Sequence, residues 1–118
     1  MNPTNLCTFN LHGFNQGKLF LNKLCNNNDI ICVQEHWLVD TECEKIVNCN
    51  EDFIVVTSPA KKGVAVNGMS VGRPYGGVAT LVHRKYAQCL RTLVTCGRYI
   101  IIQIDDVILC LSAICTLY

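Results

Sequence analysis

The start of the chain contains two short apolar segments on either side of a stretch with helical spacing. Residues 5–10 and 29–34 are predicted strands, and the second is almost continuously apolar and rich in β-branched side chains. Residues 18–25 are a predicted helix that ends at three consecutive asparagines. The helix face expected to be buried carries Phe20, Leu24 and Cys25. Strand, helix and strand within about thirty residues form a βαβ pattern, so we expect two parallel strands crossed by a helix.

The rest of the chain is mainly a series of strands. A second short helix is expected from Asp40 toward Val47, because acidic residues in its first turn suit the helix dipole. The further predicted strands cover residues 53–57, 78–83, 90–96, 99–104 and 107–117, with a hairpin turn at Asp105-Asp106. Residues 58–73 hold several glycines and no clear periodicity, so a long surface loop is expected there. This order predicts one layered α/β (α+β) domain with mixed sheets.

Composition limits the class of protein. Half of the residues are hydrophobic, which is too many for a disordered chain. The formal net charge is +1, so nucleic acid would have to be bound by local clusters of cations and not by overall charge. No segment has the length and apolarity of a signal peptide or a membrane span, and no membrane partner is expected.

Nine cysteines are present, an odd number, and none of them form a CxxC pair. Several lie in apolar segments, where a free thiol behaves as a small buried hydrophobic group. We therefore expect no disulfide bonds and a reducing compartment, cytoplasmic or nuclear. A structural zinc site is the less favoured alternative, because no histidine has the spacing of a zinc finger.

The strongest candidate for chemistry is Glu35, which directly follows the predicted strand at residues 29–34. Ligands of α/β sheets bind beyond the carboxyl ends of the strands, and a carboxylate there can hold Mg²⁺ together with water. Asn10 ends the first predicted strand, so it would reach the same edge and could orient a phosphate. The alternatives are a solvated Glu35 at the edge of a loop and an Asn10 that only forms an Asx-type turn.

A third candidate is the segment Gly72-Arg73-Pro74-Tyr75-Gly76-Gly77. Paired glycines before a strand allow another backbone or a ligand to come close. Arg73 could contact a phosphate, and Tyr75 could stack on a base or a sugar. The alternative is a tight turn with a solvated arginine.

Taken in order, these motifs closely resemble the endonuclease/exonuclease/phosphatase superfamily. The resemblance rests on Asn10 in Thr-Phe-Asn-x-His-Gly, on Gln34-Glu35-His36-Trp37, and on the glycine-rich segment that continues to Val82. Within the superfamily, the chain is most similar to the apurinic-type endonuclease domain of LINE-like retrotransposons without long terminal repeats. The resemblance implies the front half of a four-layer α/β/β/α sandwich, in residues 1–118, that lacks its C-terminal half.

The resemblance also implies roles for individual residues. Glu35 matches the ligand of Mg²⁺ (Mn²⁺ as a substitute), Asn10 matches the asparagine that organises metal and phosphate, and Tyr118 is a candidate for a tyrosine that contacts the scissile phosphate. The reaction would nick target DNA, and the partner would be the reverse transcriptase domain of the same polyprotein. The family's water-activating Asp and His groups have no counterpart here, so we expect the chain alone to be inactive. Candidate nucleic-acid contacts are His12, His36, Lys61, Lys62, Arg73 and Tyr75.

Two alternatives remain open. The chain could be a truncated retroelement product without activity that binds DNA weakly through Lys61, Lys62, Arg73, Arg84 and Lys85. It could also belong to the superfamily but act on RNA or a phospholipid. Glu35 and Asn10 do not separate these substrates, since they would handle only metal and phosphate. The two histidines in the motifs have a structural or solvated alternative as well.

Overall fold

The computed structural model describes residues 4–61, 65–66, 69–70 and 74–112. Strand β1 (Leu6–Asn10), helix α1 (Phe14–Asn27) and strand β2 (Ile30–Gln34) form the expected βαβ unit. The two strands are parallel, with Leu6 opposite Ile30 and Asn10 opposite Gln34. This register confirms that Asn10 and Glu35 reach the same edge of the sheet.

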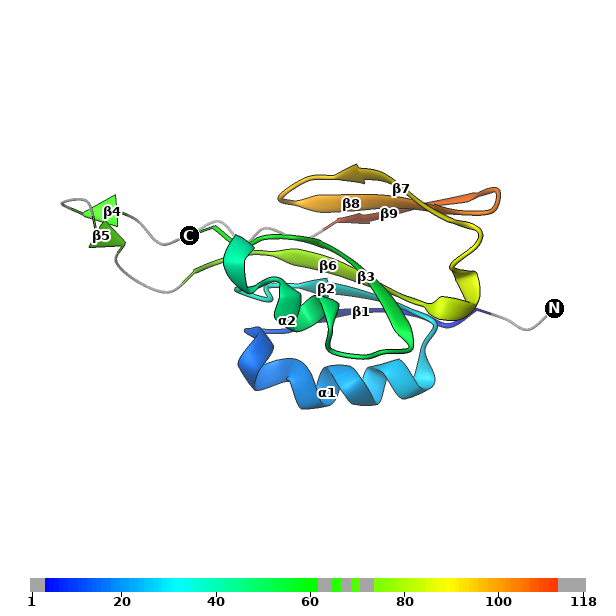
Figure 1. Ribbon diagram of the computed structural model, residues 1–118, viewed down its shortest axis with the longest axis horizontal. Coiled ribbons are helices and arrows are strands. Elements are labelled where there is room, and N and C mark those ends of the chain that lie inside the picture. Colours follow the sequence, from blue (N-terminus) through cyan, green and yellow to red (C-terminus); the bar gives the residue numbers. More distant parts are fainter. Residues whose placement is uncertain (1–3, 62–64, 67–68, 71–73, 113–118) are drawn as a thin grey trace.

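Two antiparallel strands complete a mixed sheet of order β1-β2-β6-β3. Strand β6 (Val78–His83) lies between β2 and β3 (Phe53–Ser58) and runs antiparallel to both. The short helices η1 (Asp40–Glu42) and α2 (Glu44–Val47) connect β2 to β3 in the region where a second helix was expected. Figure 1 shows α1 and α2 on one face of this sheet.

The buried face of α1 differs from the expected one. Phe14, Gly17, Leu21 and Cys25 are buried, whereas Phe20 is 48% exposed and contacts the ring of Phe9 at 4.9 Å between centroids. The helix begins four residues before the predicted start at Lys18, and it packs with Gly17 directly against Leu11, where a Cβ atom would collide. Of the predicted face only Cys25 is buried, and Leu24 is partly buried beside the core.

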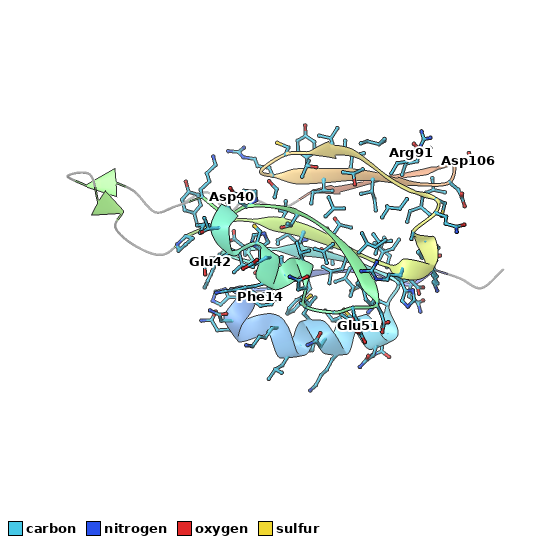
Figure 2. All side chains as sticks on the ribbon, viewed as in Figure 1. Phe14, Asp40, Glu42, Glu51, Arg91 and Asp106 are labelled. Atoms are coloured by element: carbon cyan, nitrogen blue, oxygen red, sulfur yellow. The ribbon has the colours of Figure 1, made fainter. Side chains whose placement is uncertain are left out.

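A second sheet covers the other face of the first. It consists of β7 (Leu90–Thr95), β8 (Tyr99–Ile104) and β9 (Val107–Ser112), all antiparallel, with Asp105 in the expected hairpin turn. Ile100 and Ile102 pack against Val78 and Val82 of β6. The helices, the first sheet and the second sheet therefore form three stacked layers, and side chains fill both spaces between the layers (Figures 1 and 2).

The long loop before β6 is not entirely irregular. It contains the two short antiparallel strands β4 (Ala65–Val66) and β5 (Met69–Ser70), which Figure 1 shows projecting from the body of the fold. Paired backbone hydrogen bonds between Lys61 and Tyr75, of 2.9 and 3.0 Å, close its base. The segment expected to be a long surface loop therefore contains a short hairpin, which the sequence did not predict because strands of two residues have no periodicity to detect.

Seven cysteines between Cys7 and Cys96, whose side chains the structure describes, are free thiols. Burial raises the pKa of Cys25 to about 12, so this thiol stays protonated at neutral pH. None of the described helices is long and apolar enough to cross a membrane.

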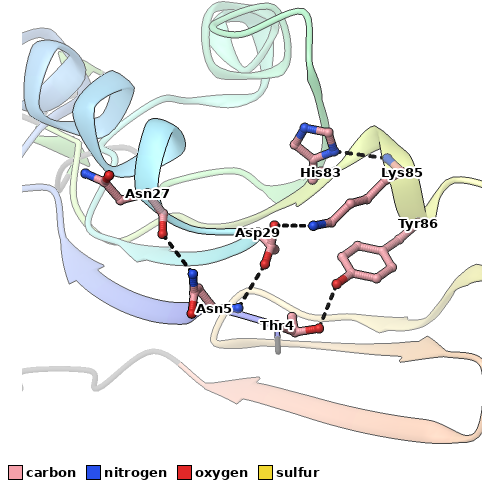
Figure 3. A network of polar contacts seen from close by, with 7 residues as sticks. All are labelled: Thr4, Asn5, Asn27, Asp29, His83, Lys85 and Tyr86. Carbon is pink, nitrogen blue, oxygen red and sulfur yellow. Dashed lines mark hydrogen bonds and ion pairs between the residues drawn. The ribbon is translucent and has the colours of Figure 1, made fainter. Parts of the chain in front are cut away.

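At the edge of the first sheet opposite Glu35, a polar network ties the start of β1 and β2 to the end of β6 (Figure 3). Asp29 forms an ion pair of 2.6 Å with Lys85 and accepts a hydrogen bond of 2.9 Å from the Asn5 backbone. Thr4 and Tyr86 share a further hydrogen bond of 2.7 Å. These contacts fix the N-terminal residues next to the 3-10 helix η2 (Arg84–Tyr86).

This network makes stability depend on pH. The hydrogen bond from Lys85, with that from Asn5, lowers the pKa of Asp29 below its ordinary value of 3.8. The contribution of Asp29 is complete above that value and is lost as the pH falls through the lower native pKa, since the unfolded chain then binds the proton first. We expect Asp29→Asn to lower the melting temperature at about pH 6, and we expect this deficit to shrink as the pH falls below the ordinary pKa of the carboxyl group. Asp106→Asn, in the exposed hairpin turn, is the control, and a deficit of Asp29→Asn that does not shrink in acid would contradict the prediction.

Candidate functional site

Three loops converge at the edge of the first sheet where β1 and β2 end and β6 begins. The segment after β1 donates to the segment after β2, from Gly13 N–H to Glu35 C=O at 2.8 Å and from Phe14 N–H to His36 C=O at 2.9 Å. The segment before β6 accepts from the same loop, since Trp37 N–H donates to Gly76 C=O at 3.0 Å. Backbone bonds thus hold this edge together before any side chain is considered.

The carboxylate of Glu35 is fixed on one side. Its Oε2 accepts a hydrogen bond of 2.8 Å from the indole Nε1 of Trp37 and one of 3.0 Å from the backbone N–H of Gly76. Within the described residues no protein group donates to Oε1. Glu35 is therefore an oriented, half-buried carboxylate with one oxygen available to a ligand, and not a solvated side chain at the edge of a loop.

The backbone at this edge is strained. The φ angles are 52° at His12, 57° at Glu35 and 60° at Trp37. These values lie in the left-handed region, which residues other than glycine rarely adopt. The other such residue in the described part of the chain is Asp105, in the hairpin turn. Strain of about 1–3 kcal/mol per residue persists only where the surrounding structure enforces it, and it is concentrated at functional sites.

Asn10 lies at the same edge and forms a local turn. Its Oδ1 accepts a hydrogen bond of 3.0 Å from the His12 N–H, which is the Asx-type turn considered as the alternative. The side chain is exposed, and its amide nitrogen makes no hydrogen bond to a described residue. The amide N–H groups are consequently available to a ligand beside Glu35.

His36 is a structural residue, and its expected role as a nucleic-acid contact is corrected. The side chain is 0% exposed, so it does not reach a ligand at the surface. Its Nδ1 accepts from Leu38 N–H at 2.9 Å, and its Nε2 therefore carries the proton that is donated to the Ser58 carbonyl oxygen at 3.0 Å. Burial lowers the pKa of His36, which keeps the ring neutral. A Cβ atom at Gly77 would overlap this ring, so Gly77 is needed here for a close approach within the protein.

The other predicted contacts fall into three groups. His12 is exposed with its ring 5.0 Å from that of Trp37, and Tyr75, 44% exposed, directly precedes Gly76. Lys61 is exposed and pairs through its backbone with Tyr75, so it lies at the base of the β4–β5 hairpin. The remaining predicted residues Lys62, Arg73 and Tyr118 lie outside the described residues.

Arg84 and Lys85, which were suggested as weak DNA contacts of a non-catalytic product, lie away from this site. Strand β6 is antiparallel to β2, so its last residue lies at the opposite edge from Glu35. Arg84 Nε donates to the Glu51 carbonyl oxygen at 2.6 Å, and Lys85 is paired with Asp29. Both cations are engaged in holding the fold.

Trp37 contacts the Glu35 carboxylate, and the sequence did not indicate this contact. It appeared only as the last letter of the motif Gln34-Glu35-His36-Trp37, and no role was assigned to it. The spacing of two residues between Glu35 and Trp37 does not by itself predict this contact, which occurs together with left-handed backbone at both positions.

The site offers hard oxygen ligands but no complete metal-binding cluster. No group of three or more His, Cys, Asp or Glu side chains suited to a metal ion occurs in the described part of the chain. Mg²⁺ is often held by one or two carboxylates together with water and substrate phosphate. The free oxygen of Glu35 fits as one such ligand, and the rest of the shell would come from elsewhere.

No protein-family model matches the chain, and no curated protein matches it by sequence. Among solved structures, it is similar to the AP endonuclease LMAP from Leishmania major, with a TM-score of 0.66 and 15% sequence identity. The alignment covers 95% of this chain and 40% of that chain. The chain thus has the α+β architecture of part of an AP endonuclease and spans less than half of that protein's length.

Proposed function

We propose that the chain carries the metal- and phosphate-binding edge of a magnesium-dependent endonuclease that nicks DNA. The observation that carries the proposal is the oriented Glu35 carboxylate, with Oε2 held by two N–H donors, at the strand ends of a fold shared with an AP endonuclease. The backbone strain at that edge supports the proposal, since His12, Glu35 and Trp37 all have left-handed φ angles.

In this proposal each residue has a defined task. Glu35 would hold Mg²⁺ or Mn²⁺ through its free oxygen, and the bound ion would polarise the scissile phosphate. The exposed amide of Asn10 would donate to a phosphate oxygen. Lys61 would contact the DNA backbone, and Tyr75 would stack on an exposed base or sugar.

A group that activates water is needed besides these residues. His36 cannot serve, because both ring nitrogens are engaged and the side chain is buried. We propose, as the resemblance implies, that water activation depends on Asp and His groups other than these residues, and that the 118-residue chain alone does not nick DNA. The motif Gln34-Glu35-His36-Trp37 supports a retrotransposon type of endonuclease, with a reverse transcriptase domain as its partner.

Metal binding gives the first test, because the chain contains a single tryptophan and its indole lies 2.8 Å from Glu35. We expect Mn²⁺ to quench Trp37 fluorescence in a saturable manner and Mg²⁺ to compete. Glu35→Gln should abolish the saturable phase, whereas Glu42→Gln, which changes an exposed carboxylate paired with Lys45, should leave it intact. If the parent chain shows no saturable quenching, or if Glu35→Gln behaves like the parent, the proposed function is wrong.

Cleavage gives the second test. In the naturally encoded protein that contains this chain, we expect Mg²⁺-dependent nicking of supercoiled plasmid to fall by about three orders of magnitude in Glu35→Gln. The 118-residue chain should leave the plasmid intact under the same conditions. Glu35-dependent nicking by the chain alone would overturn the expected inactivity, and salt-sensitive DNA binding without any cleavage by the natural protein would support a non-catalytic relic instead.

A further inference from the structure

We infer that Trp37 is a positioning residue whose indole N–H holds the Glu35 carboxylate in the orientation that presents Oε1 to a divalent cation. The inference rests on the proposed function and adds a role that the motif alone does not give. The distance from Nε1 to Oε2 is 2.8 Å, in the range of a charge-assisted hydrogen bond.

Both donors act on the same oxygen. Gly76 N–H reaches Oε2 at 3.0 Å, so the indole and the backbone together fix the rotation of the carboxylate. An unrestrained glutamate would sample several rotamers and would offer either oxygen, or both, to a cation. Fixing one oxygen favours monodentate binding through the other, which suits the strict octahedral geometry of Mg²⁺.

Trp37 is itself firmly placed. Its backbone N–H donates to the Gly76 carbonyl oxygen at 3.0 Å, and the centroid of its ring lies 5.0 Å from that of His12. A Cβ atom at Gly13 would come within 2.6 Å of the indole, so this glycine leaves the space that the ring occupies. The donor is therefore held by contacts that do not depend on a metal ion.

The residue between Glu35 and Trp37 is held in place by its own contacts. His36 is buried and bonded at both ring nitrogens, which fixes the middle of the loop. Left-handed backbone on each side, with φ of 57° and 60°, accompanies the contact between side chains two residues apart. This strain has to be offset by the packing of His36, which is the expected pattern for a preorganised site.

A purely structural tryptophan would affect folding but not metal affinity. Loss of an outer partner that orients a metal ligand typically weakens metal binding about 10- to 100-fold. The chain's affinity for Mn²⁺ therefore separates the two roles. It can be measured from the loss of the electron paramagnetic resonance signal of free Mn²⁺, which does not require tryptophan.

The experiment compares Trp37→Phe with the parent chain, with Glu35→Gln and with Tyr99→Phe. We expect Trp37→Phe to bind Mn²⁺ about 10-fold more weakly and Tyr99→Phe, which removes a polar atom from a ring in the second sheet, to bind like the parent. If Trp37→Phe unfolds, benzothienylalanine at the single tryptophan position keeps the ring shape and replaces only the N–H group, and the same 10-fold loss is expected.

The outcomes distinguish the two proposals. Glu35-dependent Mn²⁺ binding that is unchanged by loss of the indole N–H, in a folded variant, would overturn the positioning role and leave the proposed function standing. Absence of Glu35-dependent binding in the parent chain would overturn the proposed function and the positioning role with it. Weaker Mn²⁺ binding by a folded variant that lacks the indole N–H supports the positioning role.

Discussion

Gly77→Ala is expected to lower the free energy of unfolding by about 3 kcal/mol. Gly77 has a φ of 90°, and an added Cβ atom would overlap the buried ring of His36. Left-handed backbone costs an ordinary residue about 1–2 kcal/mol, and forcing an extra carbon into a packed interior costs about 1–3 kcal/mol more. Because both ring nitrogens form hydrogen bonds, the ring cannot move aside without losing its bond to the Leu38 N–H or its bond to the Ser58 carbonyl oxygen.

The neighbouring glycine provides a matched control. Gly76 has a φ of 76°, but a Cβ atom there would meet nothing within 4 Å. Gly76→Ala should therefore show only the backbone cost of about 1–2 kcal/mol. Urea denaturation followed by circular dichroism measures both values, and equal losses at the two positions would show that the contact with His36 is unimportant.

His36→Ala is expected to cost about 4 kcal/mol. The substitution removes a fully buried ring and leaves a cavity. It also deprives the Leu38 N–H and the Ser58 carbonyl of partners inside the protein. Deleting a buried aromatic side chain lowers the free energy of unfolding by about 3–5 kcal/mol, and each buried polar group left without a hydrogen-bond partner adds to the loss.

The control for this prediction is His12→Ala at the same edge. His12 is exposed, shares the left-handed backbone, and makes no side-chain hydrogen bond to a described residue, so its loss should cost less than about 1 kcal/mol. Thermal melts of both variants at neutral pH give the comparison. A His36→Ala protein as stable as His12→Ala would refute the structural role assigned to His36.

Much of the fold could be read from local patterns. The nearly continuous apolar segments became the two central strands β2 and β6, because a strand buried on both faces requires such a sequence. The βαβ order placed Asn10 and Glu35 at one edge, since parallel neighbours end on the same side of a sheet. The position of Glu35 directly after a buried strand was therefore sufficient to locate the site.

Other features depended on contacts distant in sequence. The buried face of α1 was set by Leu21 and by the contact of Gly17 with Leu11, which helical spacing alone could not choose over Phe20. Arg84 and Lys85 resembled candidate DNA contacts, but the antiparallel direction of β6 puts them at the far edge of the sheet.

The sequence by itself determined the strands, the parallel pair and the presence of a carboxylate at the strand ends, because these follow from periodicity and chain order within short segments. Only the tertiary structure decided that His36 is buried against Gly77 and that Trp37 and Gly76 hold one oxygen of Glu35. Those contacts join loops about forty residues apart through left-handed backbone, whose cost only the assembled packing can offset.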